Sequence, residues 1–430
     1  MPSSPSAPGP KPKGCLRGLF REIIMPLGMA MVVILFVIQA FKIPSASMEK
    51  TLLVGDFLLG LKLPYGAEIP FTHWKTPAFL DPKPGDILIF KYPGDPDVPE
   101  NNPARYRFVA NLFLFGVLYW DSQPKPGQSH LVVYQRKDFI KRCVAQSGQT
   151  LRVEGTDVFV DEKQMALPRH GQYESDRGFD PIRDKLSFRL PKPGETLRLD
   201  TLSLRMAMWM RSLALQENPG HKVELVLDLL KDSAVANDYV LPYLNGDPQN
   251  RHHLNLFVLM DIPAVRAVAG QVEFLHAENV PFTAIREAAK TGFVRSTDLM
   301  YPEGQSGLTR TETSEYLLPN YFDLIEQNLQ GQGEAMGASL KLRASLSIDG
   351  KVSPSYTLRQ KCYFMMGDNR DNSSDGRYWG MLSREFVKAK AAIIYFSFEN
   401  GDGRFQLTNP VTWPRIPFRI RYDRVGKLIE

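Results

Sequence analysis

Two short runs place a serine and a lysine where one could act as a nucleophile and the other as its base. Ser47 lies in the run 43–48, directly after a long apolar segment, and Lys141 lies among apolar residues in the run 139–142. A serine hydroxyl is a poor nucleophile until a neighbouring base removes its proton. The seven histidines form no recognisable Ser/His/Asp arrangement, so Lys141 is the best candidate for the base.

A lysine is a useful base only if the protein suppresses its charge. At the usual pKa of about 10.4, roughly one lysine in 2,500 is neutral at pH 7. Burial disfavours the charged form and can lower a lysine pKa to the range of about 7–8 that general bases use near neutrality. Phe139, Ile140 and Val144 supply apolar surroundings for this lysine. Taken alone, the run also describes a solvated basic pair, Lys141 and Arg142, on a strand.

A third run, 367–380, completes the set. It reads Gly-Asp-Asn-Arg-Asp-Asn-Ser-Ser-Asp-Gly-Arg-Tyr-Trp-Gly and follows the other two along the chain. Together the three runs resemble the bacterial type I signal peptidases, a family of membrane-bound Ser-Lys endopeptidases that remove signal peptides from exported proteins. The third run carries most of this resemblance, because Ser-x-Ser-Met and Phe-Ile-Lys-Arg are weak signals on their own.

The resemblance implies a role for each residue of the site. Ser47 attacks the scissile carbonyl, and Lys141 takes its proton and later helps to protonate the leaving amine. The hydroxyl of Ser45 joins the Ser47 backbone N–H in an oxyanion hole, where the loss of one donor typically lowers turnover about 10²–10³-fold. Ser373 hydrogen-bonds the lysine and orients it, as the third group of a triad does.

The same resemblance gives structural roles to four charged residues near the site. Asp375 and Arg377 form the ion pair that holds the loop, and Asp368 is the partner of Arg142. A purely structural interpretation of these four residues therefore overlaps with their functional role.

Six apolar residues correspond to family positions that line shallow pockets for the side chains one and three residues before the cut. They are Phe41, Ile43, Met48, Leu52, Leu58 and Ile140. Small pockets exclude large side chains, which agrees with the family's Ala-x-Ala preference; the alternative is that the six are plain core. The chain departs from the family pattern at Lys50, Phe139 and 145–149, which affects substrate contacts and loop geometry but leaves the nucleophile, base and orienting serine intact.

Composition limits the classes of function. The chain has 430 residues and a net charge of +5, with charges of both signs. This balance is too mild to indicate nucleic-acid binding, and no metal-ligand spacing or cofactor motif is present, so no cofactor is expected. Three cysteines do not make a disulfide framework. Cys15 precedes the apolar segment, and Cys143 and Cys362 are expected as free buried thiols rather than as a pair.

The apolar segment predicts a single membrane-spanning helix over 23–41, preceded by a disordered basic tail over 1–22. Nineteen uncharged helical residues are about as long as the apolar core of a bilayer is thick. Lys11, Lys13, Arg17 and Arg21 precede the segment. The positive-inside rule therefore places the N-terminus in the cytoplasm and the remainder outside the inner membrane. A cleavable signal peptide is the alternative interpretation, which the length of the segment disfavours.

The rest of the chain predicts a mainly β protein. A catalytic antiparallel β core is expected over 42–164 and 356–430, and the resemblance implies an inserted second domain over 165–355. The uncharged aromatic stretch 108–120 is either a membrane-interfacial segment or a core hairpin. Basic and aromatic residues over 413–427 indicate either a contact with anionic headgroups or a solvated edge strand.

The expected partners are the signal peptides of exported preproteins and the lipid bilayer, close to the protein-export channel. One rival is a penicillin-binding-type acyl transferase, because 47–50 spells S-x-x-K and 290–292 spells K-T-G; that K-T-G follows a helix-like run rather than lying on a strand. A second rival is a membrane-anchored assembly or binding protein of the same fold with an inactive site. The soluble Ser-Lys self-cleaving repressors are disfavoured by the membrane helix.

Overall fold

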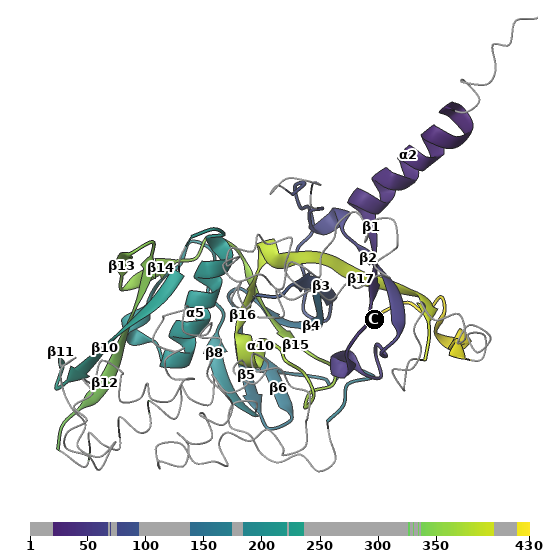
Figure 1. Cartoon of the computed structure of the whole chain (residues 1–430). Coiled ribbons are helices and arrows are strands. Elements are labelled where there is room, and N and C mark those ends of the chain that lie inside the picture. The colour runs from purple at the N-terminus through teal and green to yellow at the C-terminus, as the bar shows by residue number, and fades with distance from the viewer. Residues whose placement is uncertain are drawn as a thin grey trace, which may run out of the picture.

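The structure of the chain is a computed structural model. It describes residues 20–67, 69, 75–93, 138–173, 184–221, 223–235, 326, 330, 334, 337–399 and 419–430. Figure 1 shows one helix projecting from a body built mainly of strands, so the mainly β fold predicted from the sequence is confirmed. Several predicted features lie outside the described residues. They are the stretch 108–120, residues 1–19 of the tail with Cys15, residues 413–418, and the K-T-G of the penicillin-binding alternative.

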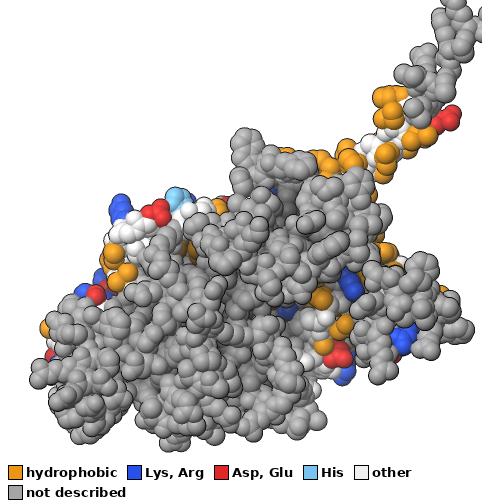
Figure 2. All heavy atoms as spheres, viewed as in Figure 1, with side chains coloured by type: hydrophobic (Ala, Val, Ile, Leu, Met, Phe, Trp, Pro, Cys, Tyr) orange, Lys and Arg blue, Asp and Glu red, His pale blue; other side chains and the backbone are white. Residues whose placement is uncertain are grey.

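The N-terminal helix begins at Phe20 and ends at Val37. Its middle is α2, Met25–Val32, and π-helical turns form the first and last five residues. None of these residues is buried, and hydrophobic side chains cover much of the helix surface in Figure 2. At about 1.5 Å per residue, 18 residues span about 27 Å, close to the thickness of the bilayer core. The helix is therefore a candidate membrane span.

The helix ends four residues earlier than the predicted span 23–41. Ile38–Lys42 form strand β1 instead, which pairs antiparallel with β2, Asp56–Leu61. The Lys62 ammonium donates hydrogen bonds to two carbonyl oxygens of the last helical turn, at 2.9 and 2.6 Å. A cation at these otherwise unpaired carbonyls stabilises a helix C-terminus. The hydropathy of the segment could not reveal this boundary, because residues 38–41 carry no charge.

Seven antiparallel strands form the sheet that carries the site. In spatial order they are β1, β2, β17 (Val387–Ser397), β3 (Ile87–Lys91), β4 (Asp138–Gln146), β15 (Cys362–Met366) and β16 (Met381–Ser383). Register shifts interrupt the pairing of β17 with both of its neighbours and of β15 with β4. Such irregularities bend strands and increase their twist, which accounts for the curl of the sheet.

The remaining strands form smaller sheets. One has the order β7-β6-β5-β8, built from Lys163–Met165, Asp157–Val160, Thr150–Glu154 and Lys185–Arg189. Another has the order β11-β10-β12-β13, built from Ala234–Val235, Val223–Lys231, Leu340–Ile348 and Lys351–Ser353. A two-stranded sheet joins β9 (Thr196–Arg198) and β14 (Ser355–Thr357). Helix α5 covers Leu204–Glu217, and the short α10 covers Gly376–Trp379.

The described part of the predicted insertion, 165–355, shares a core with the catalytic strands. Strand β8 lies inside this range but pairs with β5, which precedes it. From α5, the Gln216 side chain donates to the Met381 carbonyl and accepts from the Ser383 amide, at 2.9 and 2.7 Å. One cluster of buried hydrophobic side chains includes residues of β4, β15, α5 and β12. The domain boundary at residue 165 stays a prediction. Among the described residues, the hydrophobic core continues across this boundary.

Cys143 and Cys362 are free and buried, as the sequence predicts. Burial raises the pKa of both thiols, and that of Cys362 reaches about 12. A thiol needs its thiolate form to react, so these two residues behave as packing groups.

Candidate active site

Ser47 lies on a short 3₁₀ turn, Ala46–Met48, between β1 and β2. The turn is closed by a hydrogen bond from the Glu49 amide to the Ala46 carbonyl at 2.9 Å. The side chains of Met48 and Leu52 are fully buried, so they anchor both the turn and the residues after it to the sheet. Ser47 is only 8% exposed, and its hydroxyl therefore has a fixed environment.

Lys141 lies on β4, between β3 and β15 in the sheet. Its side chain is 4% exposed, and Nζ donates a hydrogen bond to Ser47 Oγ at 2.7 Å. Nζ also donates to the Ile140 carbonyl at 3.1 Å and lies 5.4 Å from the centre of the Phe139 ring. The strand thus brings together two residues that are 94 positions apart, within reach for a proton transfer.

Ser373 lies on the loop that follows β15, close to the turn that carries Ser47. Its side chain is 5% exposed, and within the described part of the chain its Oγ makes no hydrogen bond. A Cβ placed on Gly367 would collide with Ser373 Oγ and would lie 2.6 Å from the Ser47 carbonyl oxygen. The absence of a side chain at Gly367 therefore lets the Ser373 hydroxyl approach the turn that carries Ser47. The hydrogen bond between Ser373 and Lys141 that the sequence predicts stays a prediction.

Ser45 has extended backbone angles, with φ −131° and ψ 158°, and its side chain is exposed. Its hydroxyl makes no hydrogen bond to the 3₁₀ turn that it precedes. The side chain can therefore rotate toward the Ser47 amide without breaking a hydrogen bond to that turn.

Arg142 and Asp368 form a two-point ion pair, with Nε–Oδ1 at 2.8 Å and Nη2–Oδ2 at 2.7 Å. Asp368 is completely buried, and its Oδ2 also accepts a hydrogen bond from Thr51 Oγ1 at 2.6 Å. The sequence predicts the pair but not the threonine. The Asp368 carboxylate therefore connects three segments: strand β4 through Arg142, the loop that carries Ser373, and the residues after Ser47 through Thr51.

Asp375 and Arg377 form a second buried pair, with hydrogen bonds of 2.9 and 2.8 Å. Asp375 Oδ2 also accepts from the Gly367 amide at 2.9 Å. Burial raises the pKa of Asp375, but the Arg377 guanidinium and the Gly367 amide outweigh this, so the pKa lies below its usual range. Asp375 is thus ionised and fixes the glycine against which Ser373 packs.

Asn369 joins the loop to the nucleophile turn, a role that the sequence did not suggest. Its amide donates to the Ser47 carbonyl at 3.1 Å, and its Nδ2 donates to the Ala46 carbonyl at 3.2 Å. The only sequence signal was its place within the Gly-Asp-Asn-Arg run. These two bonds hold the peptide groups on both sides of Ser47.

The six predicted pocket residues belong to one hydrophobic cluster. Ile43, Met48, Leu52 and Leu58 are at most 2% exposed, whereas Phe41 and Ile140 are only partly buried. The first four are core residues in this structure. Phe41 and Ile140 retain accessible surface with which a peptide could make contact.

Comparison with known proteins shows the family of the chain. The family "Signal peptidase, peptidase S26" matches residues 16–205 and 327–396. The signal peptidase I of Aquifex aeolicus is 42% identical over 416 residues, which are 95% of this chain and 98% of that protein. The chain belongs to the signal peptidase family, peptidase S26. Membership makes it a serine endopeptidase.

Two further relatives share shorter stretches with this S26 peptidase. The signal peptidase I of Pseudomonas aeruginosa is 40% identical over 192 residues, 41% of this chain and 66% of that protein. That of Pseudomonas fluorescens is 43% identical over 89 residues, 19% of this chain and 31% of that protein. The chain thus spans less than two thirds of either Pseudomonas protein but nearly all of the Aquifex protein.

Proposed function

We propose that this peptidase removes signal peptides from exported preproteins, with Ser47 as the nucleophile and Lys141 as the general base. The observation that carries the proposal is the 2.7 Å distance between Lys141 Nζ and Ser47 Oγ. Both side chains are almost fully buried, and burial disfavours a charged amine. A neutral amine at this distance can accept the serine proton.

The proposed reaction has two steps. In the first, Lys141 Nζ takes the proton of Ser47 Oγ while Oγ attacks the scissile carbonyl carbon, and the resulting ammonium then protonates the leaving amine. In the second, Lys141 takes a proton from water as the water oxygen attacks the ester carbonyl carbon. The bond from that carbon to Ser47 Oγ then breaks, and Lys141 returns the proton to Oγ. The Ser47 amide and the Ser45 hydroxyl stabilise the oxyanion in both steps, because hydrogen-bond donors aimed at developing charge lower the barrier.

Specificity follows from the surface around the pair. Of the six predicted pocket residues, Phe41 and Ile140 are only partly buried, so we assign them to the pocket walls and the four buried residues to the floor. A floor of packed side chains cannot deepen without opening a cavity in the core. Small residues one and three positions before the cut are therefore preferred, as in Ala-x-Ala.

The proposed setting is the outer face of the inner membrane, with the N-terminus in the cytoplasm. Strand β1 leads directly from the helix toward the site, and its five residues span about 17 Å. Beside the helix end, Leu61, Leu63, Phe79 and Leu80 are between 38% and 65% exposed. Such an apolar surface is compatible with contact with the bilayer. The site would then stand where a signal peptide leaves the membrane, next to the export channel.

Cleavage of a purified preprotein by the detergent-solubilised chain tests the proposal. We expect one cut after a small residue, located by mass spectrometry of both products, and no cut by Ser47→Ala or Lys141→Ala. Lys163→Ala, on the exposed edge strand β7, is the matched control and should retain activity. Full activity of either site variant contradicts the Ser-Lys mechanism.

The same assay separates the rival functions. A wild-type chain that binds preprotein but never cuts it would be an assembly protein with an inactive site. Covalent labelling of Ser47 by penicillin would instead support the penicillin-binding rival, whose remaining motif at 290–292 lies outside the described residues.

A further inference from the structure

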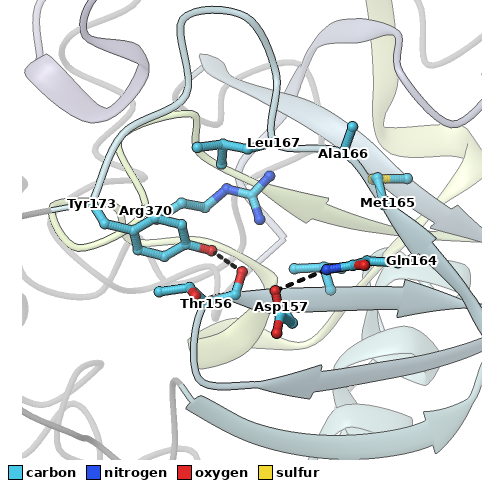
Figure 3. A pocket seen from close by; sticks show the side chains of 9 residues that line it. Thr156, Asp157, Gln164, Met165, Ala166, Leu167, Tyr173 and Arg370 are labelled. Carbon is cyan, nitrogen blue, oxygen red and sulfur yellow. Dashed lines mark hydrogen bonds between the residues drawn. The ribbon is translucent and has the colours of Figure 1, made fainter.

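A pocket of about 540 Å³ lies between the small sheet β7-β6-β5-β8 and the loop after β15 (Figure 3). Neither Ser47 nor Lys141 contributes to its lining. The residues that line it are Thr156, Asp157, Val158, Gln164, Met165, Ala166, Leu167, Tyr173 and Arg370. Two of these residues carry a charge, Asp157 and Arg370, and Arg370 is the one cation of the lining.

The Arg370 side chain is 2% exposed, and Figure 3 shows its guanidinium pointing into the pocket beside the Leu167 side chain. Its Nη1 contacts the Met366 sulfur at 3.7 Å, and its Nε makes no hydrogen bond with any residue that the structure describes. No carboxylate of the described residues lies within salt-bridge distance of it. Burial lowers the pKa of Arg370, but a guanidinium remains charged in proteins. A buried cation without a partner is costly.

The nearby carboxylates are already bound to other groups. Asp368 is paired with Arg142, and Asp375 is paired with Arg377. Asp157 also lines the pocket, but its Oδ1 accepts a hydrogen bond from the Gln164 amide at 2.9 Å. The positive charge of Arg370 is therefore available to a ligand from outside the described chain.

We propose that this pocket binds a carboxylate, which Arg370 holds through paired hydrogen bonds. The planar fork of a guanidinium matches the two oxygens of a carboxylate. Val158, Met165 and Leu167 supply an apolar wall for the carbon chain that carries such a group. The carboxylate of Asp157 in the lining disfavours a more highly charged anion such as phosphate.

The pocket lies close enough to the nucleophile to serve the substrate. Asn369, the residue before Arg370, donates its amide to the Ser47 carbonyl at 3.1 Å. An extended peptide advances about 3.3–3.6 Å per residue, so a residue a few positions from the cut can reach Arg370. The proposed pockets before the cut involve Phe41 on β1 and Ile140 on β4, neither of which lines this pocket.

Two sources can supply the carboxylate: a small free carboxylate, or an acidic side chain within about five residues after the cut. The second source rests on the proposed function, whereas the first does not. The experiments below therefore measure binding and cleavage separately.

Binding is measured on the full detergent-solubilised Ser47→Ala chain by thermal unfolding. Sodium acetate should raise the unfolding midpoint in a saturable way, beyond the effect of sodium chloride at equal ionic strength or of neutral acetamide. Leu167 is 45% exposed and lies beside the guanidinium in Figure 3. Leu167→Glu should fill the site with its own carboxylate and abolish the acetate effect, whereas the matched Leu167→Gln should retain it.

Cleavage is measured with preprotein peptides that differ only by Glu or Gln at one of the five positions after the cut. If the substrate is the source, kcat/KM should favour Glu at one position by roughly tenfold, as expected for a charge-assisted hydrogen bond. Leu167→Glu should remove the preference, and Leu167→Gln should keep it.

The outcomes are distinct. Equal midpoint shifts with acetate and chloride, or an acetate effect that survives Leu167→Glu, overturn the proposal and leave a water-filled pocket. Acetate binding without a Glu preference supports the site and identifies a free carboxylate as its ligand. Acetate binding by a chain whose Ser47-containing form cuts no preprotein supports the site while refuting the proposed function.

Discussion

Arg142 hydrogen-bonds both carboxylate oxygens of Asp368. Because Arg142 follows Lys141 on β4 and Asp368 lies on the loop that carries Ser373, this ion pair joins the strand to the loop. The two residues are 226 positions apart in the chain. Thr51, four residues after the nucleophile, hydrogen-bonds the same carboxylate at 2.6 Å. One buried charge pair therefore fixes the relative positions of the three segments that form the site.

Asp368→Asn is expected to lower both stability and turnover. The change leaves the Arg142 guanidinium buried without its counter-charge, which costs about 3 kcal/mol in the free energy of unfolding. Denaturation in detergent measures the stability, and initial rates at 25 °C measure kcat. Asp349→Asn is the matched control, because Asp349 pairs with His221 where both side chains are more than half exposed. An exposed pair contributes at most about 1 kcal/mol, so equal losses in the two variants would contradict the role given to Asp368.

Gly367→Ala is expected to disrupt the site from the side of the loop. The added methyl group would collide with Ser373 Oγ and press on the Ser47 carbonyl. Displacing reacting groups by about 1 Å can lower a rate roughly 10²-fold, so we expect kcat to fall at least tenfold. The control is Gly28→Ala in α2, where a Cβ meets no atom within 4 Å. A Gly367→Ala chain with wild-type kcat would show that the loop accommodates the methyl group without displacing the site residues.

The proximity of Ser47 to Lys141, and of Arg142 to Asp368, was predictable from the sequence because these residues lie in three short runs. Ser47, Lys141 and the Arg142–Asp368 pair were named from those runs, and the structure brings them together. The strand order that joins the runs was not predictable. Pairing of β17 with both β2 and β3 depends on contacts between distant segments, and short sequence patterns carry no information about such contacts.

Two features escaped prediction for physical reasons. The end of the helix at Val37 is stabilised by Lys62, which follows β2 and donates hydrogen bonds to carbonyls of the last helical turn. Lys62 lies outside the apolar segment, so the sequence of that segment could not predict this contact. Arg370 is one arginine of a charged run in the sequence, where nothing separates it from paired neighbours such as Arg377. Only burial and the absence of a described carboxylate beside it set it apart.

Ser373→Ala is expected to separate catalysis from stability. The Ser373 hydroxyl is buried and makes no hydrogen bond within the described structure, so its removal should not lower the free energy of unfolding. If the hydroxyl orients Lys141 during reaction, kcat should fall roughly tenfold or more, and Ser373→Thr should restore part of it. The acidic side of the plot of kcat against pH should also shift along the pH axis, since Lys141 would lose a polar neighbour. An unchanged kcat and pH profile would assign Ser373 to packing alone.

Asp375→Asn tests the second buried pair through its dependence on pH. The pKa of Asp375 lies below its usual range, because Arg377 and the Gly367 amide outweigh the effect of burial. A carboxyl whose pKa is lower in the folded state stabilises the protein fully above its unfolded pKa of about 3.9, and this contribution is lost as the pH falls through the lower folded value. Wild type should therefore exceed Asp375→Asn by about 3 kcal/mol at pH 7, and the difference should shrink below about pH 4.

The control for this prediction is Asp200→Asn. Asp200 also has a lowered pKa, caused first by its hydrogen bond with Arg198, but that arginine is 69% exposed. Solvent screening makes the contribution of such an exposed pair small. Unfolding midpoints of the three proteins between pH 3 and pH 8 therefore distinguish a buried clamp from a surface pair. A pH-independent gap between wild type and Asp375→Asn would mean that the asparagine disturbs packing, and that the charge of Asp375 does not hold the loop.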